Sequence, residues 1–196
     1  MSQPFTNTPR PETGMTNAKL GTWLFLAAEF MFCSAFASSY VLLRTAADYW
    51  PDGKETLSAS LMFITLIVMA LVWVFMAKAA KTMQYPRAPE ARKHLAIVIA
   101  LGFAAIGLMK FAGLRLWQQG ITPSTDTFHA LFYVFSGVAI LHAFATWVWT
   151  LYLAGPGFAQ ASSDAAAYAN RLACTKLVWN FTALLWAVIV FLFCMV

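Results

Sequence analysis

The sequence predicts an all-α fold, a polytopic membrane bundle of five transmembrane helices, and two observations lead to that fold class. Hydrophobic residues make up 61% of the 196-residue chain and charged residues only 11%, whereas a soluble domain has about 45–50% and about 25%. The apolar residues also gather in long runs, which follow a polar tail at residues 1–19. These runs predict membrane spans at about 20–43, 58–77, 94–116, 128–153 and 177–196.

The first span contains one charge near its middle, Glu29. A helix over residues 20–43 reaches across ~30 Å of hydrocarbon, and a carboxylate at its centre costs about 2.5–3.5 kcal/mol to insert. We therefore expect Glu29 to face the bundle interior and to hydrogen-bond a Ser, a Thr, a His or water. Two roles stay open for it: a structural carboxyl, or a site of proton exchange or partner coupling.

The next two spans differ in charge. The second has none, whereas the third carries Lys110 about six residues before its end. The lysine can extend its ammonium to the interface, or it can pair with a partner's acid or a lipid phosphate.

The fourth span follows a short polar loop. A short helix over residues 161–173, with Ser162 or Ser163 as a weak cap, is expected to run into the fifth span.

Lysine and arginine are distributed unequally between the two sides of the predicted bundle. One side has Arg44, Lys54 and Arg115, with Lys110 inside its span. The other side has nine such residues: Arg10, Lys19, Lys78, Lys81, Arg87, Arg92, Lys93, Arg171 and Lys176. The positive-inside rule then places the N-terminus in the cytoplasm and the C-terminus outside. The net charge of +5 is explained by this topology, so no nucleic-acid partner is predicted.

Residues that could hold a metal or a heme are few. His94 and His129 open their spans at interfaces and are expected to be solvated, whereas His142 lies mid-span and is expected to hydrogen-bond within the bundle or to a partner subunit. The three cysteines form no CxxC pair, and no GxSxG, phosphate-loop or HExxH motif occurs. We therefore expect no metal, no heme and no catalytic residue in this chain, which favours an accessory subunit.

The first span, TWLFLAAEFMFCSAFASSYVLLR, resembles the opening helix of cytochrome c oxidase subunit III in its short, five-helix bacterial form. The matching residues are Trp23, Leu24, Phe25, Leu26, Ala27, Ala28, Glu29, Phe32, Tyr40 and Arg44. Weaker matches are Leu101, Gly102, Phe128, Gly137, His142, Trp179, Phe181 and Trp186. The chain departs from the family pattern at Met109, Ala112, Ala139, Asn180 and Ala183, where that pattern has polar groups.

The resemblance implies a non-catalytic component of a heme-copper respiratory oxidase in the bacterial inner membrane. Such a subunit docks on the catalytic subunit, among other respiratory subunits, stabilises it, and supports proton uptake and oxygen access in aerobic electron transport. The hemes and copper or another metal are expected in that partner. Phospholipid is expected in a cleft between helices one and two and helices three to five.

Within this resemblance, Glu29 falls on the family's buried carboxylate. Further candidates for contact with a partner or with lipid are Arg44, Lys110, His142, Trp179 and Asn180. Three alternatives remain. The chain could be an accessory membrane subunit of a nitric oxide reductase, or a small proton-coupled transporter using Glu29 and Lys110. A membrane-bound enzyme is the third, and the missing ligand sets argue against it.

Overall fold

The computed structural model describes residue 9 and residues 13–82, 88–159 and 163–195. Its five long helices are α1 (Asn17–Ala46), α3 (Ala59–Thr82), α4 (Ala88–Gln118), α5 (Thr127–Ala154) and α7 (Ala165–Cys194). Two short helices lie between them, α2 (Gly53–Thr56) and the 3-10 helix η1 (Pro156–Ala159). All five long helices are long and apolar enough to cross a membrane. The predicted all-α fold is confirmed, and the chain is a multi-pass membrane protein.

The start of α7 agrees with the prediction that a helix runs into the fifth span, over the part of residues 161–173 that the structure describes. One continuous helix begins at Ala165, and residues 161 and 162 lie outside the described residues. The segment AAAYANRLACTK contains no glycine or proline that would end it. The cap differs from the prediction, because Asp164 accepts a hydrogen bond from the backbone N–H of Ala167 at 2.9 Å.

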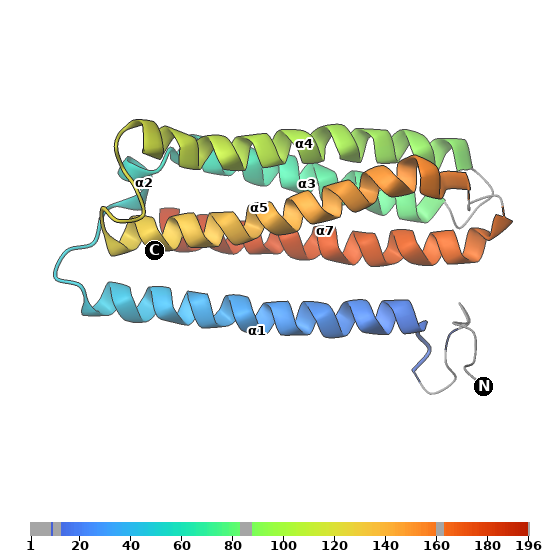
Figure 1. The fold of residues 1–196 in the computed structure, drawn as a ribbon, viewed down its shortest axis with the longest axis horizontal. Helices are drawn as coiled ribbons and strands as arrows, with labels where there is room; N and C mark the ends of the chain where they lie inside the picture. Colours follow the sequence, from blue (N-terminus) through green and yellow to red (C-terminus); the bar gives the residue numbers. More distant parts are fainter. Residues whose placement is uncertain (1–8, 10–12, 83–87, 160–162, 196) are drawn as a thin grey trace.

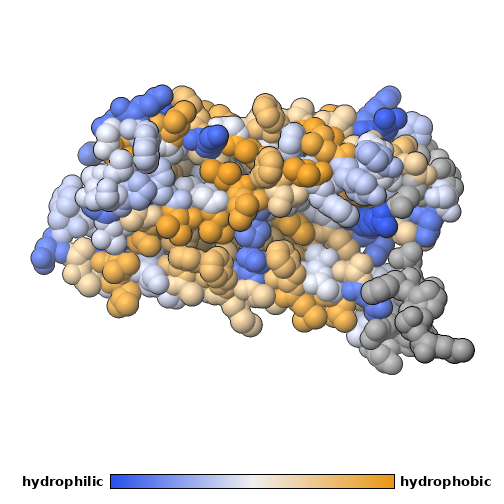
Figure 2. Space-filling view, in the orientation of Figure 1, coloured by the Kyte–Doolittle hydropathy of each residue, from blue (hydrophilic) through white to orange (hydrophobic). Residues whose placement is uncertain are grey.

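Four helices form a closed bundle, in which α3 packs against α4 and α7, and α5 packs against the same two helices (Figure 1). Large apolar side chains fill the space between them, including Met69, Met76, Phe132, Trp179 and Trp186, which are fully buried. On the face shown in Figure 2, apolar side chains dominate the middle and hydrophilic ones gather toward the two ends. That distribution fits a bundle surrounded by lipid at mid-height.

Helix α1 lies beside this bundle, against α7 and to a smaller extent α5. The expected cleft that separates helices one and two from helices three to five is therefore wrong, because the second long helix, α3, packs on α4 and α7. The connection explains the arrangement, because α2 packs on α7 and leads the chain past the end of that helix to α3. The approach is close: a Cβ at Gly53 would overlap the carbonyl oxygen of Phe193.

One end of the molecule holds the starts of α1, α4 and α7 and the ends of α3 and α5 (Figure 1). The other end holds the C-terminus, the α1–α3 connection and the loop between α4 and α5. Seven of the nine lysines and arginines assigned to the cytoplasmic side belong to described parts of the chain, because Arg10 and Arg87 lie outside them. The orientation across the membrane stays a prediction.

Candidate functional site

Polar contacts join α1 to the rest of the molecule at three depths. At the N-terminal end, the Thr16 hydroxyl donates to Oδ1 of Asn170 at 2.8 Å. At the other end, the Tyr40 hydroxyl donates to the carbonyl of Leu192 at 2.6 Å. Between them, Glu29 contacts His142 of α5. The structure thus gives Glu29 a histidine partner, one of the groups expected for it.

Glu29 and His142 meet because they lie at the same depth. Glu29 is 12 residues after the start of α1 at Asn17 (29 − 17), and His142 is 12 residues before the end of α5 at Ala154 (154 − 142). The start of α1 and the end of α5 lie at the same end of the molecule, so each residue is ~18 Å along its helix from that end. The sequence-based prediction does not pair the two residues, although their equal spacing from one end of the bundle is a signal that could have paired them.

The geometry of the pair fixes one proton. His142 Nδ1 lies 2.9 Å from the carbonyl oxygen of Val138, which can only accept, so Nδ1 carries a hydrogen. His142 Nε2 lies 3.2 Å from Oε2 of Glu29. Either Nε2 accepts a hydrogen bond from a protonated Glu29, or an imidazolium donates to a carboxylate. Both states are neutral overall and hold one proton in this contact, which lets an acid remain at mid-membrane depth.

The pair is partly open to its surroundings. The Glu29 side chain is 24% exposed and the His142 side chain 13%. An adjoining groove of about 420 Å³ is lined by His142 together with residues of α1, α5 and α7, including Phe25, Trp149 and Val178. The Phe181 ring lies 6.0 Å from the imidazole, between ring centres. This arrangement can hold and exchange a proton beside an apolar groove.

The other predicted contact residues lie apart from this pair. Lys110 is exposed on α4, a helix that does not pack closely on α1. Arg44 is half-buried and lines a cavity with Tyr40. The expectation for Trp179 is wrong, because this side chain is fully buried and donates from Nε1 to Thr150 Oγ1 at 3.0 Å. It is a packing residue of the bundle, and neither lipid nor a partner can reach it.

Asn180 and His94 each bury a polar atom with no hydrogen-bond partner among the described residues: Oδ1 of Asn180 and Nδ1 of His94. Both side chains are half-buried, so His94 is less solvated than expected. The role of Asn180 in contacting a partner stays a prediction.

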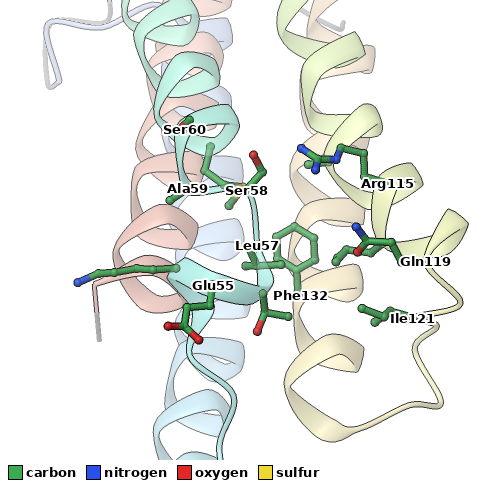
Figure 3. Close-up of a pocket in the computed structure, with 14 residues that line it drawn as sticks. Glu55, Leu57, Ser58, Ala59, Ser60, Arg115, Gln119, Ile121 and Phe132 are labelled. Atoms are coloured by element: carbon green, nitrogen blue, oxygen red, sulfur yellow. The ribbon is translucent and has the colours of Figure 1, made fainter.

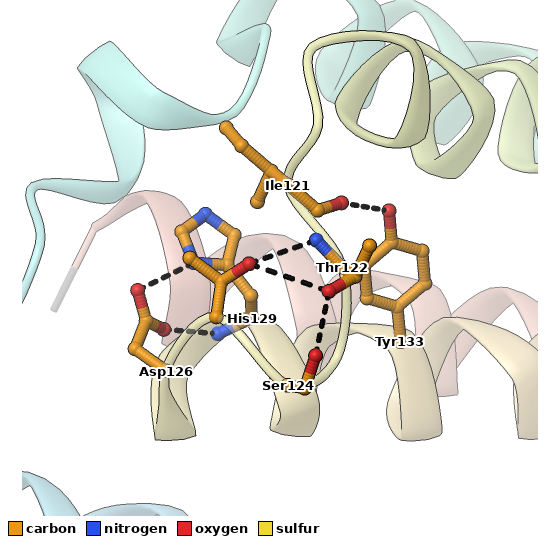
Figure 4. Close-up of polar contacts among 7 residues, drawn as sticks. Ile121, Thr122, Ser124, Asp126, His129 and Tyr133 are labelled. Atoms are coloured by element: carbon orange, nitrogen blue, oxygen red, sulfur yellow. Dashed lines mark hydrogen bonds and ion pairs between the residues drawn. The ribbon is translucent and has the colours of Figure 1, made fainter.

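His129 is buried, contrary to the expectation that it is solvated, because it pairs with Asp126 (Figure 4). Asp126 caps α5 by accepting from the backbone N–H of His129 at 2.8 Å, and its other oxygen lies 2.7 Å from His129 Nδ1. Nearby, the Tyr133 hydroxyl donates to the carbonyl of Ile121 at 2.8 Å. The signal in the sequence was an Asp three residues before a His at a helix start, a common capping pattern.

Metal ligands are not gathered anywhere in the described part of the chain: no group of three or more His, Cys, Asp or Glu residues lies close enough to hold an ion. The Glu29–His142 pair is therefore a two-residue site, with proton exchange and hydrogen bonding as its available chemistry.

No protein-family model matches the chain. Two curated relatives, both named probable quinol oxidase subunit 3, match it over most of its length. The one from Staphylococcus aureus is 25% identical over 175 residues, which cover 87% of this chain and 85% of the relative. The one from Staphylococcus haemolyticus is 24% identical over 181 residues, which cover 90% and 87%.

The chain is a distant relative of subunit III-like oxidase proteins. The resemblance seen in the first span is thereby confirmed. It also extends far beyond that span, since the matched region covers nearly nine-tenths of the chain. At 24–25% sequence identity the relatives are distant. The roles of individual residues in those proteins therefore cannot be assigned to this chain from the similarity alone.

Proposed function

We propose that this chain is the non-catalytic, subunit III-like component of a heme-copper respiratory oxidase in the bacterial inner membrane. It docks on the catalytic subunit, which holds the hemes and copper, and stabilises it while supporting proton uptake and oxygen access. The observation that carries the proposal is the nearly full-length similarity to quinol oxidase subunit 3 proteins. The name of these relatives also favours a complex that is fed by a quinol and reduces oxygen.

The surface of α1 supports a docking role. This helix buries only Leu26 and Tyr40 and leaves large apolar side chains such as Leu24, Phe30 and Met31 exposed. Small residues lie on the same helix and are exposed too: Ala27, Ala28, Ala35, Ser38 and Ser39. Small side chains let another helix approach closely within a membrane. We expect the catalytic subunit to cover part of this surface.

The Glu29–His142 pair fits the same proposal as a proton-holding contact on the helix that faces the partner. It also fits a purely structural role, in which the pair only fixes α1 to the bundle. His142 lines the groove beside the pair, so the imidazole borders an open space, which is compatible with exchange.

Affinity purification of the tagged full-length chain from its native membranes in mild detergent tests the proposal. We expect a larger membrane subunit with visible heme absorbance to co-purify and to reduce oxygen with quinol. A complex that consumes nitric oxide and not oxygen would favour the nitric oxide reductase alternative. A chain that elutes alone and moves protons or solutes in proteoliposomes would contradict the proposal and favour the transporter.

A further inference from the structure

The groove that adjoins the Glu29–His142 pair is lined by three helices. Phe25 of α1, Trp149 of α5 and Thr175 of α7 are among its lining residues. Its volume of about 420 Å³ lies within the range of about 300–1,000 Å³ that is typical of ligand pockets. Of the pair itself only His142 lines the groove, so the other lining residues determine what the groove can bind.

The polar side chains of this groove are hydrogen-bond acceptors. Three threonine hydroxyls line it, and each already donates to a carbonyl oxygen one turn earlier in its own helix: Thr22 to Ala18 at 2.9 Å, Thr146 to His142 at 2.7 Å and Thr175 to Arg171 at 2.8 Å. A hydroxyl has one hydrogen and two lone pairs, so these oxygens can accept a further hydrogen bond but have no hydrogen left to donate. Both imidazole nitrogens of His142 are also engaged, by Val138 and Glu29. The groove therefore suits a ligand that donates a hydrogen bond.

A second cavity, of about 580 Å³ at the end of α4, offers a different set of polar groups (Figure 3). Arg115 lines it, and Gln119 extends from the same helix beside it. A guanidinium has donors and no acceptor, so this cavity suits a ligand with acceptor oxygens. The groove differs because it offers threonine acceptors and, from Cys174, one thiol that is only a weak donor.

The depth of the groove requires a ligand that dissolves in lipid. Helix α1 has 30 residues and is ~45 Å long, which exceeds the hydrocarbon thickness of ~30 Å by ~15 Å. Thr22 lies five residues after the helix start at Asn17 (22 − 17), close to the edge of the hydrocarbon. His142 lies ~10 Å deeper. An ion would lose its hydration at this depth, so the ligand has to be neutral.

Aromatic side chains form the rim of the groove, and hydroxyl groups form its floor. Phe25 and Trp149 are each 47% exposed, whereas Thr146 is 5% and Thr175 2% exposed. An aromatic ring in the groove can pack against the two rings of the rim while a hydroxyl on that ring reaches the floor. An acyl chain would fill the same space but would leave the threonine oxygens without a donor.

We propose that this groove binds a neutral, lipid-soluble phenol, which is an aromatic ring with a hydroxyl and an apolar tail. The hydroxyl donates to the oxygen of Thr146 or Thr175, the ring packs against Phe25 and Trp149, and the tail extends into the surrounding lipid. A phenol keeps its hydrogen near neutral pH, because a phenolic hydroxyl has a pKa of about 10. The site lies within this chain and does not depend on the proposed role in an oxidase.

The test is equilibrium dialysis of para-pentylphenol against the full-length chain in nanodiscs, with empty nanodiscs correcting for partition into lipid. The methyl ether, para-pentylanisole, is the matched ligand, because it keeps the ring and the tail but has no hydrogen to donate. We expect the phenol to bind about fivefold more tightly than the ether, which is the fold-change that one net hydrogen bond gives. The alcohol para-pentylcyclohexanol has no aromatic ring and should bind more weakly than the phenol.

The double variant Thr146→Val/Thr175→Val keeps the shape of the floor but removes both acceptor oxygens. It should bind the phenol and the ether equally, with its affinity for the ether unchanged. Thr146→Ser/Thr175→Ser keeps both hydroxyls and should retain the preference, which separates loss of the acceptors from loss of folding. Thr182→Val is the control, because the fully buried Thr182 also donates to its own helix, at Val178, and does not line the groove.

Filling the groove tests where the phenol binds. Ala145→Phe adds a ring to the lining and should weaken the binding of both ligands by a similar factor. The proposal is overturned if the double valine variant keeps the preference for the phenol, if Thr182→Val loses it equally, or if Ala145→Phe binds both ligands as the parent chain does. It is also overturned if the cyclohexanol binds as tightly as the phenol, since the groove would then recognise an alcohol without an aromatic ring.

Discussion

Helix α1 and the four-helix bundle of α3, α4, α5 and α7 are held in different ways. Within the bundle, α7 buries twelve of its residues, whereas α1 buries two. The bundle is closed by interlocking methionine and aromatic side chains. By contrast, α1 is fixed by three polar contacts at its two ends and its middle, made by Thr16, Glu29 and Tyr40.

The difference shows what holds helices together in a lipid. Lipid tails are as apolar as leucine, so burying an apolar face against another helix gains packing but little hydrophobic free energy. A bundle with deep interlocking packing is stable on that basis. A helix that contacts its neighbours only along a narrow strip needs hydrogen bonds or ion pairs to stay attached to them. Helix α1 makes such polar contacts at intervals along its length.

The largest expected effect is in the bundle. Trp179→Ala removes a fully buried indole and its hydrogen bond to Thr150, and should lower the free energy of unfolding by about 3–5 kcal/mol. Unfolding in mixed detergent micelles measures it. Trp149→Ala is the control, because Trp149 is 47% exposed and should lose far less. Equal losses for the two variants would contradict the packing described for the bundle.

A double-mutant cycle on Glu29→Ala and His142→Ala tests the central contact of α1. We expect a coupling of about 0.6–1.7 kcal/mol, the range from average to largest measured between membrane helices. Glu29→Gln should cost less than Glu29→Ala if the contact is a neutral hydrogen bond, because the amide can still donate to Nε2. It should cost as much or more if the contact is an ion pair.

The control for this cycle pairs Glu29→Ala with Lys110→Ala. Lys110 is exposed on α4, so the two losses should add within about 0.5 kcal/mol. A coupling larger than that would show communication between Glu29 and Lys110 and would revive the transporter alternative. Absence of coupling between Glu29 and His142 would remove the contact on which the candidate site depends.

The smallest effect is expected at the far end of α1. Tyr40→Phe deletes the hydroxyl that donates to Leu192 and leaves the ring contacts with Trp50 and Phe193 in place. The loss should be about 0.6 kcal/mol, the average for a hydrogen bond between membrane helices. Tyr49→Phe, on an 81% exposed side chain, should change nothing measurable in the same unfolding titration. A larger loss for Tyr49 would refute the assignment.

The sequence was informative about the candidate site in part. Glu29 can be identified from the sequence alone as a carboxylate inside an apolar run. Because inserting it into the membrane is costly, the sequence also predicts that it has a polar partner. The identity of that partner was not predicted, although Glu29 and His142 lie equally far from the same end of the molecule. Sequence position also misled at His129 and Trp179. His129 was expected to be solvated because it opens a span, but Asp126 pairs with its Nδ1 and the side chain is buried. Trp179 was expected to contact a partner or lipid, but its indole donates to Thr150 inside the bundle.

The sequence by itself determined the five spans and the all-α fold, because a membrane permits few other ways to satisfy the backbone of a long apolar run. It also determined that Glu29 needs a polar partner within the protein, because a lone carboxylate at mid-membrane depth is costly. Only the tertiary structure decided which helix provides that partner. Each span is apolar on nearly every side, so its sequence pattern does not indicate which helices pack against it. The passage of the α1–α3 connection across the end of α7, with Gly53 against Phe193, places α1 outside the bundle and within reach of His142.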